Sequence, residues 1–269
     1  MKHLIRFGAA LAFFAHSAAG AQEFNLDDVV QAEILPGWQT ETGTWRAALH
    51  LRLAPHWKTY WRAPGETGIP PFFDLSGSTN IATMNLHWPI PQVFDLNGLQ
   101  TIGYTTDLVL PMDLAPATAG QPMALVAQIN LGVCRDICVP VTLNLAADLS
   151  GTGAPDARIT AALADQPQAA AKAGLTAVHC SVEPIPDGLR LTAELALPAT
   201  GARETGVIEL ADPAIWVSTA QTRRTGDLLT LSAELLNNAG TGFALDRSAV
   251  RLTVLGTDRA VELWGCPAG

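Results

Sequence analysis

Apolar and polar residues alternate with a period of two along most of the chain. Every second residue from Trp45 to Leu53 is apolar, which is the pattern of a half-buried β-strand. The same alternation recurs at residues 108–112, 123–131, 139–145, 189–195, 229–235, 250–254 and 261–263. Turn-forming stretches separate these segments, at residues 63–66, 75–78 and 96–99. Many short strands joined by such turns predict an all-β chain built from immunoglobulin-like β-sandwiches.

The strand pattern stops in the middle of the chain, where the composition becomes that of a linker. Within this stretch, Asp156 can cap a short helix that carries Ile159 and Leu163 on one face and ends before Pro167. We therefore expect two immunoglobulin-like β-sandwich domains joined by a short helical linker. The expected bounds are residues 22–150 for the first domain, 151–174 for the linker and 175–269 for the second domain.

The first 21 residues have the pattern of a secretory signal peptide. Lys2 and Arg6 give a basic start, residues 7–15 are apolar, and small residues precede a cleavage site after Ala21. This segment is too short to span a membrane, and no later stretch is long and apolar enough to do so. We expect an exported, periplasmic protein without a membrane span, in an oxidising compartment where disulfides persist.

The charge of the chain excludes one class of partner. Removing the signal peptide removes the basic residues Lys2 and Arg6, so the net charge moves from −9 to −11. Such an acidic chain without a basic patch is unsuited to nucleic acid or to anionic lipid. We therefore expect protein partners and no nucleic acid.

Sequence motifs exclude several enzyme classes as well. The chain has no Gly-rich phosphate loop, no H-E-x-x-H and no G-x-S-x-G motif. The histidines beyond the signal peptide are scattered without metal-ligand spacing, at His50, His56, His87 and His179. We expect no metal site and no organic cofactor.

The most informative stretch is the loop that carries Cys134 and Cys138. Disulfide-bonded cysteines have Cα atoms about 4.4–6.8 Å apart, whereas four residues of extended strand span roughly 13 Å. If these cysteines pair, the chain between them must therefore turn; Arg135 and Asp136 suit an exposed turn, and Pro140 prevents a helix from continuing. A disulfide that closes so short a loop stabilises little, so this pair favours thiol exchange, which needs a second cysteine for resolution.

The other two cysteines favour a structural bond. Cys180 lies near the start of the second half and Cys266 near its end, so their pairing would close a loop of about 85 residues. The chain-entropy estimate for such a loop is about 4 to 4.5 kcal/mol. We expect a structural disulfide here, while exchange with the first pair would require the two domains to touch.

Two alternative functions remain open at this point. Cys134 and Cys138 as thiolates are suitable copper(I) ligands, with Met112 or Met123 as a further soft ligand, which would make the chain a copper-binding or copper-tolerance protein. The chain could also be a non-catalytic interaction module in which all four cysteines are structural. Zinc is disfavoured because it needs four ligands and the loop supplies two.

A set of motifs in the first half resembles a known family. The order is W-K-T-Y-W-R-x-P-G at residues 57–65, W-P-x-P at 88–91, G-Y at 103–104 and G-V-C-x-x-x-C-x-P at 132–140. Together these motifs resemble the N-terminal periplasmic domain of the DsbD family of thiol:disulfide interchange proteins. They are most similar to the relatives that are linked to suppression of copper sensitivity.

The resemblance implies a redox cysteine pair under a mobile cap loop on an immunoglobulin-like sandwich. It implies that Cys138 attacks a partner disulfide and that Cys134 resolves the mixed disulfide. The cap and shielding residues that it implies are Tyr60, Asp95, Gly98, Gly103 and Tyr104.

The chain also departs from that family in two respects. The best-known members have a longer interval between the two cysteines, and full-length members continue into a membrane domain and a thioredoxin-like domain. We expect this chain to lack both domains. Its implied partners are therefore periplasmic thioredoxin-like or disulfide-bearing proteins, with a separate membrane protein as electron donor.

Overall fold

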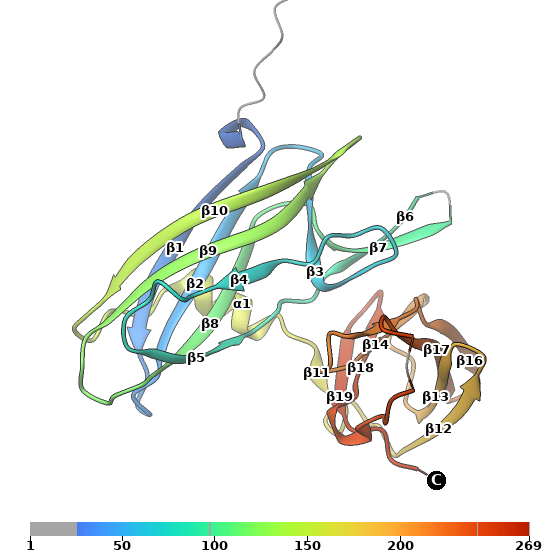
Figure 1. The fold of residues 1–269 in the computed structure, drawn as a ribbon. Helices are drawn as coiled ribbons and strands as arrows, with labels where there is room; N and C mark the ends of the chain where they lie inside the picture. Colours follow the sequence, from blue (N-terminus) through green and yellow to red (C-terminus); the bar gives the residue numbers. More distant parts are fainter. Residues whose placement is uncertain (1–25, 97, 241, 269) are drawn as a thin grey trace, which may run out of the picture.

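The computed structural model describes residues 26–96, 98–240 and 242–268. The predicted signal peptide lies outside the described residues. In the described part, strands predominate, and they form two β-sandwiches, each with its own buried apolar core (Figure 1). The predicted all-β, immunoglobulin-like fold is confirmed.

The N-terminal sandwich consists of two antiparallel sheets. The first has the order β1 (Val30–Gln39), β2 (Trp45–Leu53), β8 (Leu108–Pro116) and β5 (Ile81–Leu86). The second has the order β10 (Cys138–Leu149), β9 (Met123–Cys134), β3 (Lys58–Gly65), β7 (Leu99–Tyr104) and β6 (Gln92–Leu96), and β4 (Phe72–Asp74) pairs with β9. A 3-10 turn, Leu26–Asp28, precedes β1.

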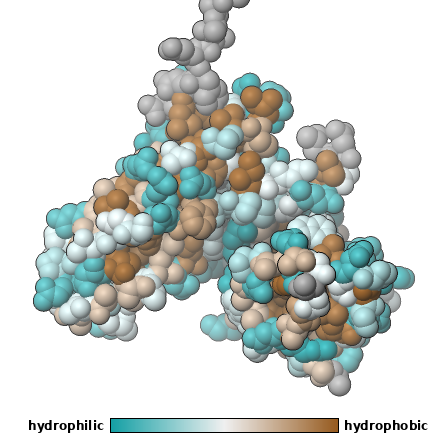
Figure 2. Space-filling view, in the orientation of Figure 1, coloured by the Kyte–Doolittle hydropathy of each residue, from teal (hydrophilic) through white to brown (hydrophobic). Residues whose placement is uncertain are grey.

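Alternation decides which side of each strand is buried in this sandwich. Along β9, Leu125, Ala127, Ile129, Leu131 and Val133 point into the core, where each is at most 3% exposed. The intervening residues of β9 lie on the outer face of the sheet, because successive side chains of a strand point to opposite faces. Figure 2 shows apolar and polar surface interspersed on the visible face of this sandwich.

The C-terminal sandwich is also made of two sheets. One has the order β11 (Gln168–Ala169), β19 (Ala260–Trp264), β18 (Arg251–Gly256) and β14 (Glu204–Glu209). The other has the order β12 (Ala177–Ile185), β13 (Gly188–Ala196), β17 (Leu228–Asn237) and β15 (Ile215–Val217), and β16 (Gln221–Thr225) pairs with β17. A 3-10 turn, Arg247–Ala249, precedes β18.

The segment between the sandwiches is packed against both. Helix α1 (Ala157–Ala164) begins after Asp156, whose side chain accepts a hydrogen bond from the Arg158 backbone N–H as an N-cap. Ile159 of this helix is fully buried on the N-terminal sandwich. Further along, Ala170 and Ala173 belong to the core of the C-terminal sandwich, so the stretch expected as a linker with a short helix packs partly against each sandwich.

One predicted turn is instead part of a strand. Residues 63–65 continue β3, and the pairing with β7 shifts register between Tyr60 and Gly65. Gly65 has a φ of 81°, and a Cβ at this position would lie 2.4 Å from the Gln100 carbonyl oxygen. A glycine therefore permits a bulge where Pro and Gly in the sequence indicated a turn.

No helix in the described ranges is both long and apolar enough to cross a membrane.

Candidate functional site

The cysteine loop is the turn of the β9–β10 hairpin. Cys134 ends β9, Cys138 begins β10, and the two are register partners joined by a disulfide, with a Cα–Cα distance of 4.1 Å. The Arg135 backbone N–H donates to the Ile137 carbonyl at 3.0 Å and closes the turn. Figure 1 shows this hairpin tip extending from the same side of the sandwich as the β6–β7 hairpin.

The two sulfur-bearing residues differ sharply in exposure. Cys134 is 2% exposed, whereas Cys138 is exposed and follows Ile137, which is 67% exposed. Thiol–disulfide exchange requires one sulfur to be accessible to the sulfur of the partner. In this bond only Cys138 offers that access, and Cys134 is the sulfur held inside.

Tyr60 holds the buried sulfur. Strand β3 pairs with β9 so that Lys58 lies opposite Cys134, and Tyr60, two residues further along, projects from the same face of the sheet. The Tyr60 hydroxyl donates to Cys134 Sγ at 2.9 Å and lies 3.4 Å from Cys138 Sγ. Burial raises the pKa of Tyr60 above its usual value, so the phenol keeps the proton that it donates.

Lys58 lies beside the rings of Tyr60 and Phe94, although the sequence did not single out Lys58 or Phe94 as a site residue. The Lys58 ammonium lies 5.9 Å from the centroid of the Tyr60 ring and 5.2 Å from that of Phe94. It also donates to Thr101 Oγ1 at 3.2 Å. Phe94 and Thr101 are register partners in the β6–β7 hairpin, so Lys58 connects this hairpin to the strand that carries Tyr60.

Three of the predicted cap residues shape the β6–β7 hairpin itself. Asp95 Oδ1 accepts a hydrogen bond from the Gly98 N–H at 3.2 Å, and Gly98 has a φ of 82° in the hairpin turn. Gly103 pairs with Tyr60, and a Cβ on Gly103 would lie 2.0 Å from the Thr59 carbonyl oxygen. Asp95 and Gly98 therefore fix the turn, and Gly103 lets β7 lie close to β3, the strand that carries Tyr60.

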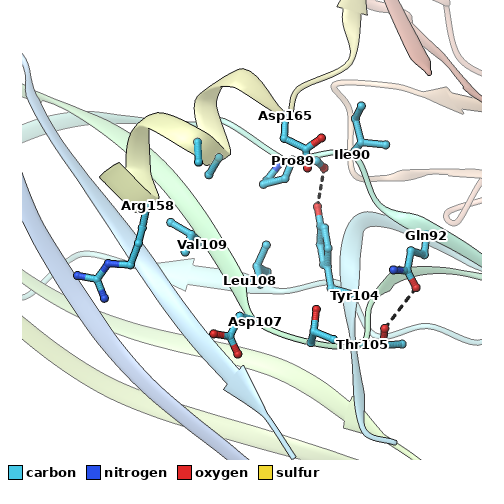
Figure 3. A pocket seen from close by; sticks show the side chains of 13 residues that line it. Pro89, Ile90, Gln92, Tyr104, Thr105, Asp107, Leu108, Val109, Arg158 and Asp165 are labelled. Atoms are coloured by element: carbon cyan, nitrogen blue, oxygen red, sulfur yellow. Dashed lines mark hydrogen bonds between the residues drawn. The ribbon is translucent and has the colours of Figure 1, made fainter. Parts of the chain in front are cut away.

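Tyr104, the second residue of the predicted aromatic shield, lies on the other face of this sheet. It pairs with Thr59 rather than with Tyr60, and its side chain belongs to the buried core. Its hydroxyl donates to the Pro89 carbonyl at 2.8 Å, beside a groove of about 460 Å³ that α1 borders (Figure 3). The shield on the cysteine side thus contains Tyr60, without Tyr104.

The charged residues of the cysteine loop are paired with each other. Arg135 donates from Nε to Asp136 Oδ2 at 3.0 Å, and its guanidinium lies 5.3 Å from the centroid of the Trp57 ring. The two side chains therefore form one exposed ion pair at the turn. Such a pair leaves little net charge to act on the disulfide.

The second disulfide lies in a different environment. Cys180 and Cys266 are bonded with a Cα–Cα distance of 5.5 Å, and the two residues are 2% and 1% exposed. Arg247 donates from Nη1 to the Cys180 carbonyl at 2.9 Å. Neither sulfur is accessible to a visiting protein, and the bond joins strand β12 to the segment that follows β19.

Strand β3 also joins the two sandwiches. Arg62 donates to both carboxylate oxygens of Glu209, at 2.9 and 3.1 Å, and to Glu262 at 2.6 Å. The Arg62 side chain is only 14% exposed, and its guanidinium stacks 3.9 Å from the centroid of the Trp61 ring. The strand that positions Tyr60 is therefore tied, two residues later, to the C-terminal sandwich.

Metal-binding side chains do not cluster in the part of the chain that the structure describes. Within the described ranges, no group of three or more His, Cys, Asp or Glu side chains converges. Met112 and Met123, considered above as copper(I) ligands, are buried in the core of the N-terminal sandwich. They occupy the inner face, whereas Cys134 contacts Tyr60 on the outer face.

Comparisons with known proteins give a family match and a structural match. Residues 31–149 match the family model described as "Thiol:disulfide interchange protein DsbD, N-terminal". No match was found among curated protein sequences. The crystal structure of the N-terminal periplasmic domain of ScsB from Proteus mirabilis is similar in fold, with a TM-score of 0.63 and 24% identity over 89% of this chain and 92% of that chain.

Proposed function

Residues 31–149 form a DsbD-type N-terminal domain, and from this premise we propose that the protein passes electrons to partner proteins through Cys134 and Cys138. The observation that carries the proposal is the asymmetry of this disulfide. Cys138 is exposed, whereas Cys134 is 2% exposed and accepts a hydrogen bond from Tyr60. One sulfur can meet a partner while the other is held ready to resolve the mixed disulfide.

The reaction begins with both cysteines reduced. The Cys138 thiolate attacks one sulfur of a partner disulfide, a bond forms between them, and the other partner sulfur leaves as a thiolate. The Cys134 thiolate then attacks Cys138 Sγ, which re-forms the Cys134–Cys138 bond and releases the second partner sulfur as a thiolate. Two electrons pass to the partner, and the protons given up by Cys134 and Cys138 balance those that the partner thiolates take up.

Tyr60 is suited to assist this step. A hydroxyl that donates to sulfur stabilises the thiolate more than the neutral thiol, because the thiolate carries the full charge. The Tyr60 hydroxyl is 2.9 Å from Cys134 Sγ. It thus favours the form of Cys134 that resolves the mixed disulfide, and in the reverse reaction it favours Cys134 as the leaving group.

The partners are proposed to be periplasmic thioredoxin-like or disulfide-bearing proteins. Ile137, next to Cys138, is 67% exposed and gives a partner an apolar contact beside the reacting sulfur. Each turnover leaves the pair oxidised, so a dithiol donor, proposed to be membrane-bound, must reduce it again. We propose export to the periplasm because residues 1–21 have the sequence pattern of a signal peptide.

The C-terminal sandwich is proposed to be an accessory domain that helps to position partners. Its Cys180–Cys266 bond is buried, and Arg62 ties it to strand β3 of the redox sandwich. A second sandwich tied to strand β3 would restrict the directions from which a partner can approach Cys138.

Trapping the mixed disulfide tests this function. The Cys134→Ala variant keeps the attacking sulfur but lacks the resolving one, so it should accumulate a covalent adduct with an oxidised thioredoxin-like protein on Cys138. The Cys138→Ala variant, its matched control, should form almost none because the remaining sulfur is buried. Equal adduct yields from the two variants, measured by non-reducing electrophoresis and peptide mapping, would exclude the proposed division of roles.

A further inference from the structure

Lys58 lies beside the Tyr60 ring on the face that carries the disulfide. It is the register partner of Cys134, its ammonium lies 5.9 Å from the centroid of the Tyr60 ring, and the hydroxyl of that ring donates to Cys134 Sγ. Lys172, the other lysine in the described ranges, is exposed in the C-terminal half. Lys58 is partly buried, and burial lowers its pKa.

The surroundings of Lys58 are aromatic and polar but contain no counter-charge. Its ammonium contacts the rings of Tyr60 and Phe94 and the hydroxyl of Thr101, and in the described part of the chain no carboxylate forms an ion pair with it. A partly desolvated cation that has no anionic partner is stabilised when a negative charge forms nearby. Reduction of the disulfide creates such a charge on sulfur.

The other charged groups around the site are engaged elsewhere. Arg135 pairs with Asp136 at the tip of the loop. Glu66 Oε2 accepts from the Gln100 N–H, and Asp95 Oδ1 accepts from the Gly98 N–H. Each of these carboxylates is held at a donor other than Lys58, so in the described part of the chain Lys58 is a cation of this face without an ion-pair partner.

We propose that Lys58 is a positioning residue for the exchange at Cys134, which acts through Tyr60. Its ammonium holds the Tyr60 ring between the disulfide and the β6–β7 hairpin, and its charge favours the thiolate that Tyr60 stabilises. This inference rests on the proposed function, because it concerns the same sulfur. It adds the group that keeps the hydroxyl in place and supplies the positive charge.

The inference also specifies which sulfur carries the charge during the reaction. When a partner thiolate attacks Cys138 Sγ, the new bond joins the partner to Cys138 and the electron pair of the broken bond stays on Cys134. Lys58 and Tyr60 then face an anion in place of a neutral sulfur. In the opposite direction the same groups increase the fraction of Cys134 that is deprotonated and able to attack.

The test is a titration of Cys134 in the full chain with Cys138→Ala, in which it is the free thiol of the redox pair. Thiolate formation is followed by ultraviolet absorbance as the pH is raised. Lys58→Met and Lys58→Gln should raise the Cys134 pKa, so that the thiolate fraction below that pKa falls about tenfold. Lys58→Arg should keep most of the thiolate, and Lys172→Met, the matched control, should leave the pKa unchanged.

A double-mutant cycle then tests whether Lys58 acts through Tyr60. In a Tyr60→Phe background, Lys58→Met should change the Cys134 pKa clearly less than it does in the chain that keeps Tyr60, because the two residues act on the sulfur together. The proposal is overturned if the Met and Gln variants titrate like the parent, if Lys58→Arg behaves like Lys58→Met, or if the effect is the same without the Tyr60 hydroxyl.

Failure of the proposed function would have a different signature. The titration needs no partner, whereas the relay is tested by adduct formation with a thioredoxin-like protein. If the Cys134 pKa depends on the charge of residue 58 but no adducts form, the proposed relay fails and the role of Lys58 at the sulfur stands. If adducts form but the Lys58 variants leave the Cys134 pKa unchanged, the relay stands and this inference fails.

Discussion

The two disulfides of this protein are the same kind of bond in contrasting surroundings. Cys134–Cys138 spans four positions at a hairpin tip and has one exposed cysteine, whereas Cys180–Cys266 spans 86 positions and has both cysteines buried. The first therefore closes a short loop that a partner can reach, and the second closes a long loop that no partner can enter. Burial and loop length together separate a bond suited to exchange from a bond suited to stability.

The neighbours of the two bonds differ as well. The Cys134 sulfur accepts a hydrogen bond from Tyr60, beside which lies Lys58, so groups able to stabilise a thiolate are in place. At the second bond, Arg247 donates to the Cys180 carbonyl, which fixes the backbone and leaves the sulfur alone. The groups beside the first disulfide can therefore stabilise a thiolate, whereas the group beside the second disulfide fixes the backbone.

The largest expected difference is in stability. Replacing both Cys180 and Cys266 by Ala should lower the free energy of unfolding by about 4.5 kcal/mol, because the unfolded chain regains the entropy of a long loop. The same replacement of Cys134 and Cys138 should cost about 2 kcal/mol on the same loop-entropy estimate. Urea unfolding of the two double variants measures both values, and equal losses would contradict the structural assignment of the second bond.

The next effect concerns the connection between the two regions. Arg62→Met should lower the free energy of unfolding by about 2 kcal/mol, because Glu209 and Glu262 lose the cation that they share in a largely buried site. Arg223→Met, at an exposed position of the C-terminal sandwich, should cost less than about 0.5 kcal/mol. Equal effects in thermal unfolding would show that Arg62 does not hold the sandwiches together.

A smaller effect separates the chemistry of the two bonds. Tyr60→Phe should slow the reduction of Cys134–Cys138 by dithiothreitol about tenfold, the equivalent of one hydrogen bond to a charged group. The reduction of Cys180–Cys266 in the same sample should be unchanged, which makes the second bond an internal control. An unchanged rate at the first bond, followed by thiol labelling and mass spectrometry, would remove Tyr60 from the reaction.

The smallest expected effect is a pH dependence in the C-terminal sandwich. Burial, the strongest influence, raises the pKa of Glu204, but hydrogen bonds from Arg224 and Thr200 outweigh it and leave the pKa below its usual 4.5. A lowered folded-state pKa gives stability that is present above the unfolded-state pKa and is lost as the pH falls through the folded-state value. Glu204→Gln should flatten this acid limb in urea unfolding between neutral pH and about pH 3; an unaltered limb would contradict it.

Local patterns were sufficient to predict much of this fold. Alternation identified β9, whose buried residues are those expected, and the spacing of Cys134 and Cys138 indicated the turn between them. The Asp156 cap and the buried Ile159 of helix α1 were likewise predictable. Each of these features depends on residues that are close together in the sequence.

The features that were missed depend on register between distant strands. Tyr104 faces the core because β7 pairs with β3 so that Tyr104 lies opposite Thr59, and no local pattern fixes that register. Lys58 and Phe94 meet for the same reason, although they are 36 positions apart. The K-T-Y order within the first motif was the one available signal that Lys58 and Tyr60 share a face.

The most direct test is to offer both disulfides to one reductant. The oxidised protein is mixed with a reduced thioredoxin-like dithiol protein, free thiols are blocked, and the modified cysteines are identified by mass spectrometry. The account predicts modification of Cys134 and Cys138, with Cys180 and Cys266 left unmodified. Modification of all four to the same extent, or of the second pair first, would contradict it.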